Sequence, residues 1–160
     1  MNTYHLRRQE KTIEDQDELI AIIQGQKYMT LAMCRDDEPY LVSLNYGFDP
    51  EARCFYIHCA GEGKKIDILR ANPTVWGQVI EDLHYQDGKC DHFFRSVHFQ
   101  GRVSFVDDID EKRAALHLMI DALEPDPEPV EQRLVTAKSL ESVTILKIAV
   151  EGWSGKKSLK

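Results

Sequence analysis

Several features that would assign a chain to a broad class of protein are missing from these 160 residues. No run approaches the roughly 20 apolar residues that a membrane helix needs, so we expect no membrane segment. Residues 1–18 contain basic side chains with no apolar stretch behind them, which argues against a signal peptide. The four cysteines form no CxxC pair. With no export signal, we expect reduced thiols and a cytoplasmic protein.

Positive charge is also scarce, because 20 Lys and Arg face 27 Asp and Glu, for a formal net charge of -7. Proteins that bind nucleic acid need cations to neutralise phosphates, so we expect no nucleic-acid partner. No GxGxxG fingerprint of a nicotinamide site follows a strand-like run. The composition is otherwise that of a globular protein, with 42% hydrophobic residues. The length predicts one domain, 1–160, with its core at about 25–150 and a C-terminal tail at 151–160.

Short runs of strand-forming residues separated by turn residues predict a mainly β fold with peripheral helices. Six strands are expected, at residues 27–34, 40–48, 53–59, 74–83, 93–106 and 142–150. The first three lie close enough for an antiparallel meander, and Gly101 should bend the fifth. Helices are expected at 15–24 with Thr12 as cap, at 64–71, from Asp108 or Asp110 to 123, and near 130–139, after an acidic loop at 124–129. These elements predict an antiparallel β-barrel, closed or split.

Side chains alternate along the first two strands and separate a bulky face from a small one. In the first strand, Met29, Leu31 and Met33 oppose Thr30, Ala32 and Cys34. In the second, Val42, Leu44, Tyr46 and Phe48 oppose Leu41, Ser43, Asn45 and Gly47. A solvent-facing side would normally carry Lys or Glu. We therefore expect the small face to be covered either by a second subunit, a flat ligand or both, or by the N-terminal helix, and the pattern favours neither alternative.

The segment AGEGKK at residues 60–65 joins a strand to a helix. Glycine lets the backbone approach an anion, and the free N–H groups of a helix N-terminus attract negative charge. Lys64 and Lys65 add two cations, so the segment has the parts of a site for one phosphate. A solvated turn with surface lysines explains the same residues, and the spacing is not that of a P-loop.

Histidine and cysteine residues offer few other sites. His84, Cys90, His92 and His98 are close in sequence but lack the tight ligand pairs of a zinc site, so we expect no metal. An axial haem ligand among His58, His92 and His98 stays open. Cys59 is either a reactive thiol near Lys64 or a small buried residue.

Four segments together resemble the pyridoxamine 5′-phosphate oxidase-like flavin-binding split barrels, above all the nitroimidazole-resistance (Nim-type) branch. They are KYMTLAM, DEPYLVSLNYGF, FYIHCAGEGKKIDILRANP and FFRSVHFQGRVSFVDD, within residues 25–123. The resemblance implies a six-stranded antiparallel split barrel that forms a homodimer, with FMN in the cleft between subunits. It implies a flavin-dependent reductase of nitroaromatic or similar small electron acceptors, with NAD(P)H as a candidate donor. The alternative is a non-enzymatic flavin or haem carrier or sensor of the same fold.

The resemblance also implies roles for single residues. The phosphate would be held after the third strand, the flavin ring would lie along the second strand, and the long fifth strand would reach in from the partner. His58 would donate a proton to the acceptor, because imidazole exchanges protons near neutral pH. The implied cofactor-binding residues are Ser43, Asn45, Tyr46, His58, Cys59, Gly63, Lys64, Lys65, Arg95, Ser96 and Trp153.

Two departures from the oxidases bear on the reaction. Leu41 and Tyr46 stand where those enzymes carry basic residues, and GWSGKKSLK does not match their Arg-rich terminal motif. Both departures argue against oxidation of vitamin B6. They also leave haem and deazaflavin open as alternatives to FMN.

Overall fold

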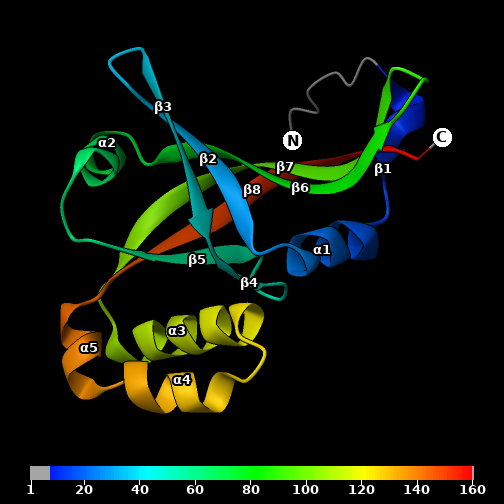
Figure 1. Ribbon diagram of the computed structural model, residues 1–160. Helices are drawn as coiled ribbons and strands as arrows, with labels where there is room; N and C mark the ends of the chain where they lie inside the picture. Colours follow the sequence, from blue (N-terminus) through cyan, green and yellow to red (C-terminus); the bar gives the residue numbers. More distant parts are fainter. Residues whose placement is uncertain (1–7, 160) are drawn as a thin grey trace.

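Eight strands form one antiparallel sheet in this computed structural model, which describes residues 8–159 (Figure 1). Residues 1–7 and 160 of the predicted domain lie outside that range. The strands follow the order β3-β2-β6-β7-β8-β5-β4, and β1 pairs with β8. The predicted mainly antiparallel split barrel is confirmed, as a sheet that is not closed between β3 and β4. The strands are β1 (Thr12–Ile13), β2 (Tyr28–Arg35), β3 (Glu38–Asn45), β4 (Gly47–Asp49), β5 (Cys54–Cys59), β6 (Thr74–Gln86), β7 (Asp91–Val106) and β8 (Thr144–Ser158).

The helices lie around the sheet. Three of them gather at one end of the molecule, and α1 and α2 lie apart from this group (Figure 1). Asp108 begins α3 by accepting a hydrogen bond from the Glu111 N–H, as one of the two predicted caps. No helix within residues 8–159 is long and apolar enough to cross a membrane. The helices are the short 3₁₀ helix η1 (Gln9–Lys11), α1 (Gln16–Gly25), α2 (Lys64–Ala71), α3 (Ile109–Leu123), α4 (Pro127–Leu134) and α5 (Ala137–Ser142).

Two predictions near the N-terminal half are wrong. Thr12 does not cap α1: it lies in β1 opposite Lys156, and Asp15 accepts the capping hydrogen bond from the Asp17 N–H. The second predicted strand breaks at Tyr46 into β3 and β4, and with β1 this makes eight strands rather than six. The fourth and fifth predicted strands are also longer than expected, because β6 runs to Gln86 and β7 begins at Asp91, which leaves a turn at 87–90 between them.

The C-terminal predictions need a larger correction. Residues 151–158 are not a tail, because they continue β8 and pair with β7 as far as Phe94 opposite Ser158. Glycine at position 155 lets β8 run close to α1, since a Cβ there would lie 2.2 Å from Leu19 Cδ2 on that helix. The expected irregularity at Gly101 is confirmed by a register shift between β7 and β8. The acidic loop ends early, with α4 starting at Pro127, and the helix predicted near 130–139 is divided between α4 and α5.

The core lies on the bulky side of the strands, as the alternation predicts. Met29, Leu31 and Met33 are almost fully buried, together with Ile66 and Leu69 of α2. At its centre, the stacked rings of Phe55 and Phe99 have centroids 4.4 Å apart. α1 packs into this same core through the side chains Leu19, Ile22 and Ile23.

Candidate functional site

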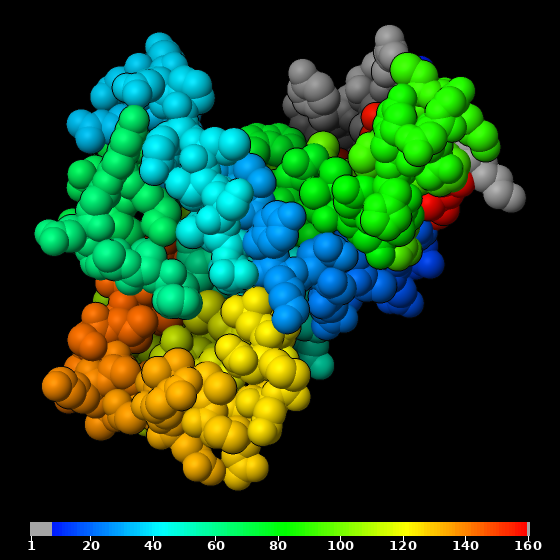
Figure 2. Space-filling model, in the orientation of Figure 1, coloured from blue at the N-terminus to red at the C-terminus, as the bar shows by residue number. Residues whose placement is uncertain are grey.

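One side of the sheet is left exposed over β3, β2 and β6, next to β7, and we call it the open face. Its register places Leu41, Ala32 and Trp76 in one row across three strands. The next row contains Ser43, Thr30 and Gln78. In the space-filling view, β2, β3 and β6 lie side by side at the surface with α3 and α4 below them (Figure 2). Its large exposed apolar side chains are Tyr28, Leu41, Trp76 and Ile80.

The composition of the open face suits contact with another surface. Leu41 is 63% exposed and Trp76 is 50% exposed, with small side chains between them. Soluble proteins rarely expose a wide apolar patch that has no function. The sequence left open what covers this face. The N-terminal helix is now excluded, because α1 packs on the core side with Met29. A second subunit and a flat ligand remain.

Polar groups continue the open face on β7. The side-chain nitrogen of Gln78 lies 2.8 Å from His98 Nε2. Burial, with a smaller contribution from the charge of Lys156, lowers the pKa of His98, so a neutral imidazole can accept this hydrogen bond. Ser96 is buried, and its hydroxyl donates to the Lys156 carbonyl at 3.4 Å. His98 was proposed from the sequence only as a haem ligand, although the strand alternation places it on the same side as Ser96.

Arg95 points to the other side of β7. Its guanidinium pairs with Glu81 and lies 3.7 Å from a carboxylate oxygen of Glu18 on α1. These carboxylates, led by the hydrogen bond with Glu81, raise the pKa of Arg95. Arg95 and Ser96 therefore face opposite sides of the sheet, and only Ser96 lies on the side of the open face.

The glycine–lysine turn contacts β3, the edge strand of the open face, from the core side of the sheet. Gly63 has a φ of +118°, which favours glycine, and a Cβ there would meet no atom within 4 Å. α2 begins at Lys64, as predicted. The Lys64 ammonium is 3.1 Å from Glu38 Oε1 and 4.9 Å from the centre of the Tyr40 ring, both on β3. The turn is thus next to β3, but Tyr40 packs against the core, on the side of the strand opposite to Leu41 and Ser43.

The second lysine of the turn lies on another side of α2. Lys65 is partly buried, and its charge acts on Cys59 at the end of β5. Burial outweighs this charge and raises the pKa of Cys59. The thiol is therefore protonated at neutral pH, which favours a small packing residue over a reactive thiolate.

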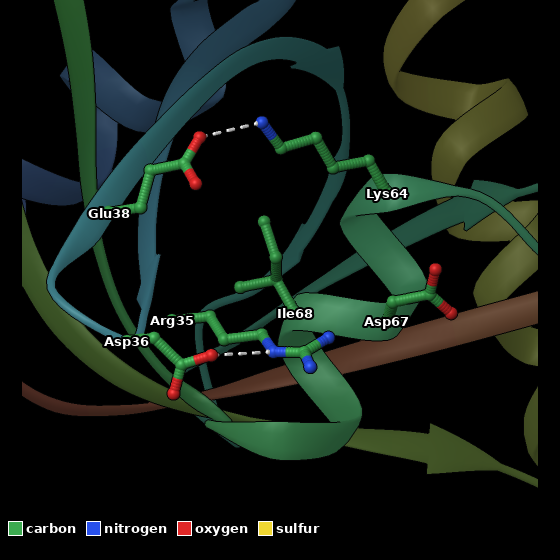
Figure 3. Close-up of a pocket in the computed structure, with 6 residues that line it drawn as sticks. All are labelled: Arg35, Asp36, Glu38, Lys64, Asp67 and Ile68. Carbon is green, nitrogen blue, oxygen red and sulfur yellow. Dashed lines mark hydrogen bonds and ion pairs between the residues drawn. The ribbon is translucent and has the colours of Figure 1, made fainter.

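A cavity of about 380 Å³ opens between the β2–β3 hairpin and α2 (Figure 3). The Arg35 guanidinium is already paired with Asp36 at 3.2 Å, and Lys64 with Glu38. With two cations and three carboxylates, the lining has a small excess of negative charge. The lining residues are Arg35, Asp36, Glu38, Lys64, Asp67 and Ile68.

Other implied cofactor residues are divided between the two sides of the sheet. Ser43 is exposed on the open face, and Asn45 on the same strand donates its side-chain amide to the Lys27 carbonyl at 2.8 Å. Tyr46 is in the core, where its hydroxyl donates to the Ile23 carbonyl at 2.5 Å and burial raises its pKa. The bulky-face assignment of Tyr46 is confirmed, and Tyr46 does not share the side of Ser43.

The remaining two residues lie away from the open face. His58 is exposed at the end of β5, on the opposite side of that strand from Cys59. Trp153 lies on the core side, where its indole N–H donates to Gln16 of α1 at 2.9 Å and its ring contacts the guanidinium of Arg53. The structure therefore places Ser43, Asn45 and Ser96 on one side of the sheet, with Ser96 three strands away from the other two, and the turn at residues 63–65 beside the core side of β3.

The histidines and cysteines near the β6–β7 turn are arranged differently. His92 Nε2 lies 2.7 Å from Asp82 Oδ1, and Cys90 is exposed in the turn. Within residues 8–159, no group of three or more His, Cys, Asp or Glu side chains could hold a metal ion.

The match to a known protein family covers most of the chain, whereas the match to a single known sequence covers less than half of it. The sequence profile of pyridoxamine 5′-phosphate oxidase matches residues 15–157. An uncharacterised protein of Rhizobium meliloti (strain 1021) is 33% identical over 70 residues, which are 43% of this chain and 44% of that protein. The match thus spans less than half of that relative.

Solved structures with a similar fold cover nearly the whole chain. A proposed 5-nitroimidazole antibiotic resistance protein of Bacteroides thetaiotaomicron has a TM-score of 0.77 and 25% identity, over 91% of this chain and 86% of that one. The flavocytochrome of Azotobacter vinelandii has a TM-score of 0.79 and 20% identity, over 99% and 74%. An FAD- and haem-binding protein of Mycobacterium smegmatis has a TM-score of 0.78 and 20% identity, over 94% and 74%. The last two share the fold with this chain.

Proposed function

Because this chain belongs to the pyridoxamine 5′-phosphate oxidase family, we propose that it binds FMN between two copies of itself and reduces nitroaromatic or similar small acceptors. One observation carries the proposal: the lysine-bearing turn before α2 contacts the core side of β3, the edge strand of a sheet whose other side exposes Leu41 and Trp76. Similarity to the proposed nitroimidazole resistance protein supports this choice of acceptor.

The residues of the turn fit a phosphate group. Gly63 leaves open space where any other residue would place a Cβ, so an anion can approach the backbone. The start of α2 offers backbone N–H groups, and Lys64 and Lys65 offer two ammonium groups. These residues would hold the FMN phosphate.

The chemistry of the reaction would come from the cofactor, which when bound transfers hydride equivalents from a donor such as NAD(P)H to an acceptor. Ser43 and Asn45 can offer hydrogen bonds to the edge of the ring from β3, and Ser96 is the candidate from the partner subunit. His58, exposed at the end of β5, is the candidate to hold a proton for the acceptor. Covering the open face with a second subunit would exclude water from the ring.

An absorption spectrum of the purified protein tests the proposal directly. We expect the two visible bands of an oxidised flavin, or uptake of one FMN per chain by colourless protein. NAD(P)H together with a nitroaromatic should then give repeated turnover. Protein that neither contains nor takes up FMN would refute the proposal.

A second candidate, a carrier or sensor of flavin or haem, is favoured by the fold shared with flavin- and haem-binding proteins. The same experiment separates the two. A Soret band indicates haem, and a bound flavin that NAD(P)H fails to bleach, with or without a nitroaromatic, indicates a carrier or sensor.

The proposed dimer makes its own prediction at Leu41. Leu41→Glu places one carboxylate from each copy in the interface, because a two-fold contact contains the same residue twice. An unpaired buried charge costs roughly 3–5 kcal/mol, so the dimer should weaken by roughly 100-fold or more. Light scattering behind a sizing column measures the change from dimer to monomer.

Leu134→Glu is the matched control, since Leu134 is an exposed leucine on α4, away from the open face. That variant should remain dimeric. A Leu41→Glu protein that stays dimeric at micromolar concentration would show that subunits meet elsewhere.

A further inference from the structure

We propose that Glu38 is an internal counter-ion of Lys64 that competes with the FMN phosphate for this lysine, and so weakens the binding of phosphorylated flavins. This inference rests on the proposed function. It identifies a residue that sets the affinity of the site without contacting the flavin ring.

The contact between the two side chains is direct. The Lys64 ammonium lies 3.1 Å from Glu38 Oε1, and the two groups point at each other across the mouth of the cavity (Figure 3). Beneath the ammonium, the Tyr40 ring adds a cation–π contact at 4.9 Å. The lysine that a phosphate would need is therefore already held by a carboxylate.

The hairpin between β2 and β3 fixes the backbone position from which the Glu38 side chain extends. Asp36 and Asp37 have φ values of +52° and +63°, as in a two-residue turn of type I′. Arg35 and Glu38 face each other as the closing pair of the ladder. Because the turn is tight and the register is set, the Glu38 side chain starts from a defined point opposite α2.

The other cation of the cavity is also paired with a carboxylate. The Arg35 guanidinium is paired with Asp36 at 3.2 Å, and Asp67 adds a third carboxylate. A phosphate approaching Lys64 meets repulsion from Glu38 at short range. Binding then requires an exchange, in which the ion pair with Glu38 opens and one with the phosphate forms. Riboflavin has no phosphate and needs no exchange.

The experiment compares Glu38→Gln with the unaltered protein, using flavin fluorescence to follow titrations with FMN and with riboflavin. Glu38 is 73% exposed and Lys64 is 55% exposed, so the ion pair is well solvated. We expect FMN to bind about threefold to fivefold more tightly to the variant, the order expected for an exposed pair, with riboflavin affinity unchanged. A general disturbance of the fold would alter both ligands.

Asp67→Asn is the matched control, because it removes one negative charge from the same cavity at a residue that makes no ion pair with any of the described residues, 8–159. It should alter FMN affinity less than Glu38→Gln does. Equal gains in the two variants would overturn the proposal in favour of general charge repulsion. Unchanged or weaker FMN binding by Glu38→Gln would overturn it while the proposed function stands. Absence of FMN binding in every form would overturn both.

Discussion

Alanine in place of both Lys64 and Lys65 should weaken FMN binding by roughly 100-fold. A charge-assisted hydrogen bond to phosphate contributes about 1.5 kcal/mol at the low end of its range, which suits partly exposed lysines, and 1.4 kcal/mol corresponds to tenfold. Riboflavin affinity should change little, because it has no group for these ammonium groups to bind. Fluorescence titrations with the two flavins measure the difference.

A double variant with Lys89→Ala and Lys138→Ala controls for the loss of two positive charges. Both lysines are exposed, one in the β6–β7 turn and one on α5. That variant should bind FMN as the unaltered protein does. Equal loss of affinity in the two double variants would mean that net charge, not the turn before α2, governs binding.

Gly77→Ala should destabilise the fold by about 3 kcal/mol, near the upper end for an overpacked core. A Cβ at Gly77 would lie 2.0 Å from Phe99 Cζ and 2.4 Å from Cε1. The Phe99 ring cannot yield easily, since it is fully buried and stacked on Phe55. For a chain of this length, the melting temperature should fall by roughly 6–12 °C, as followed by circular dichroism.

Gly25→Ala is the corresponding control. Gly25 ends α1, and a Cβ there meets nothing within 4 Å. Alanine favours helix over glycine, so this variant should be as stable as the unaltered protein or slightly more so. Should Gly77→Ala melt at the same temperature as Gly25→Ala, the packing of Phe99 over β6 would be much looser than these distances imply.

Much of the candidate site follows from local patterns. Gly63, Lys64 and the helix from Lys64–Ala71 are apparent in the sequence, because turn residues and helix periodicity act over a few positions. The contact with Glu38 is not apparent, since 26 residues separate it from Lys64. Only the packing of α2 against the β2–β3 hairpin brings the carboxylate to the ammonium.

The residue roles that the family resemblance implies can also be checked against the alternation of side chains. The alternation of side chains correctly places Tyr46 on the core side, where it binds the Ile23 carbonyl. The same alternation places Arg95 and Ser96 on opposite sides of the sheet. Motif resemblance treats these neighbours as one group, although consecutive residues of a strand point to opposite sides of the sheet.

Local residue chemistry is sufficient for the strand character, the bulky and small faces of β2 and β3, and the phosphate-type turn, because these depend on period-two alternation and on glycine and lysine within a few residues. Contacts between distant segments decided the rest. Glycine, serine and lysine in 151–158 have little tendency to form a strand, yet pairing with β7 and contact with α1 make them one. Thr12 and Asp15 are both good helix caps, and the pairing of β1 with β8 selects Asp15. Whether the open face is covered also depends on where α1 packs, which no local pattern encodes.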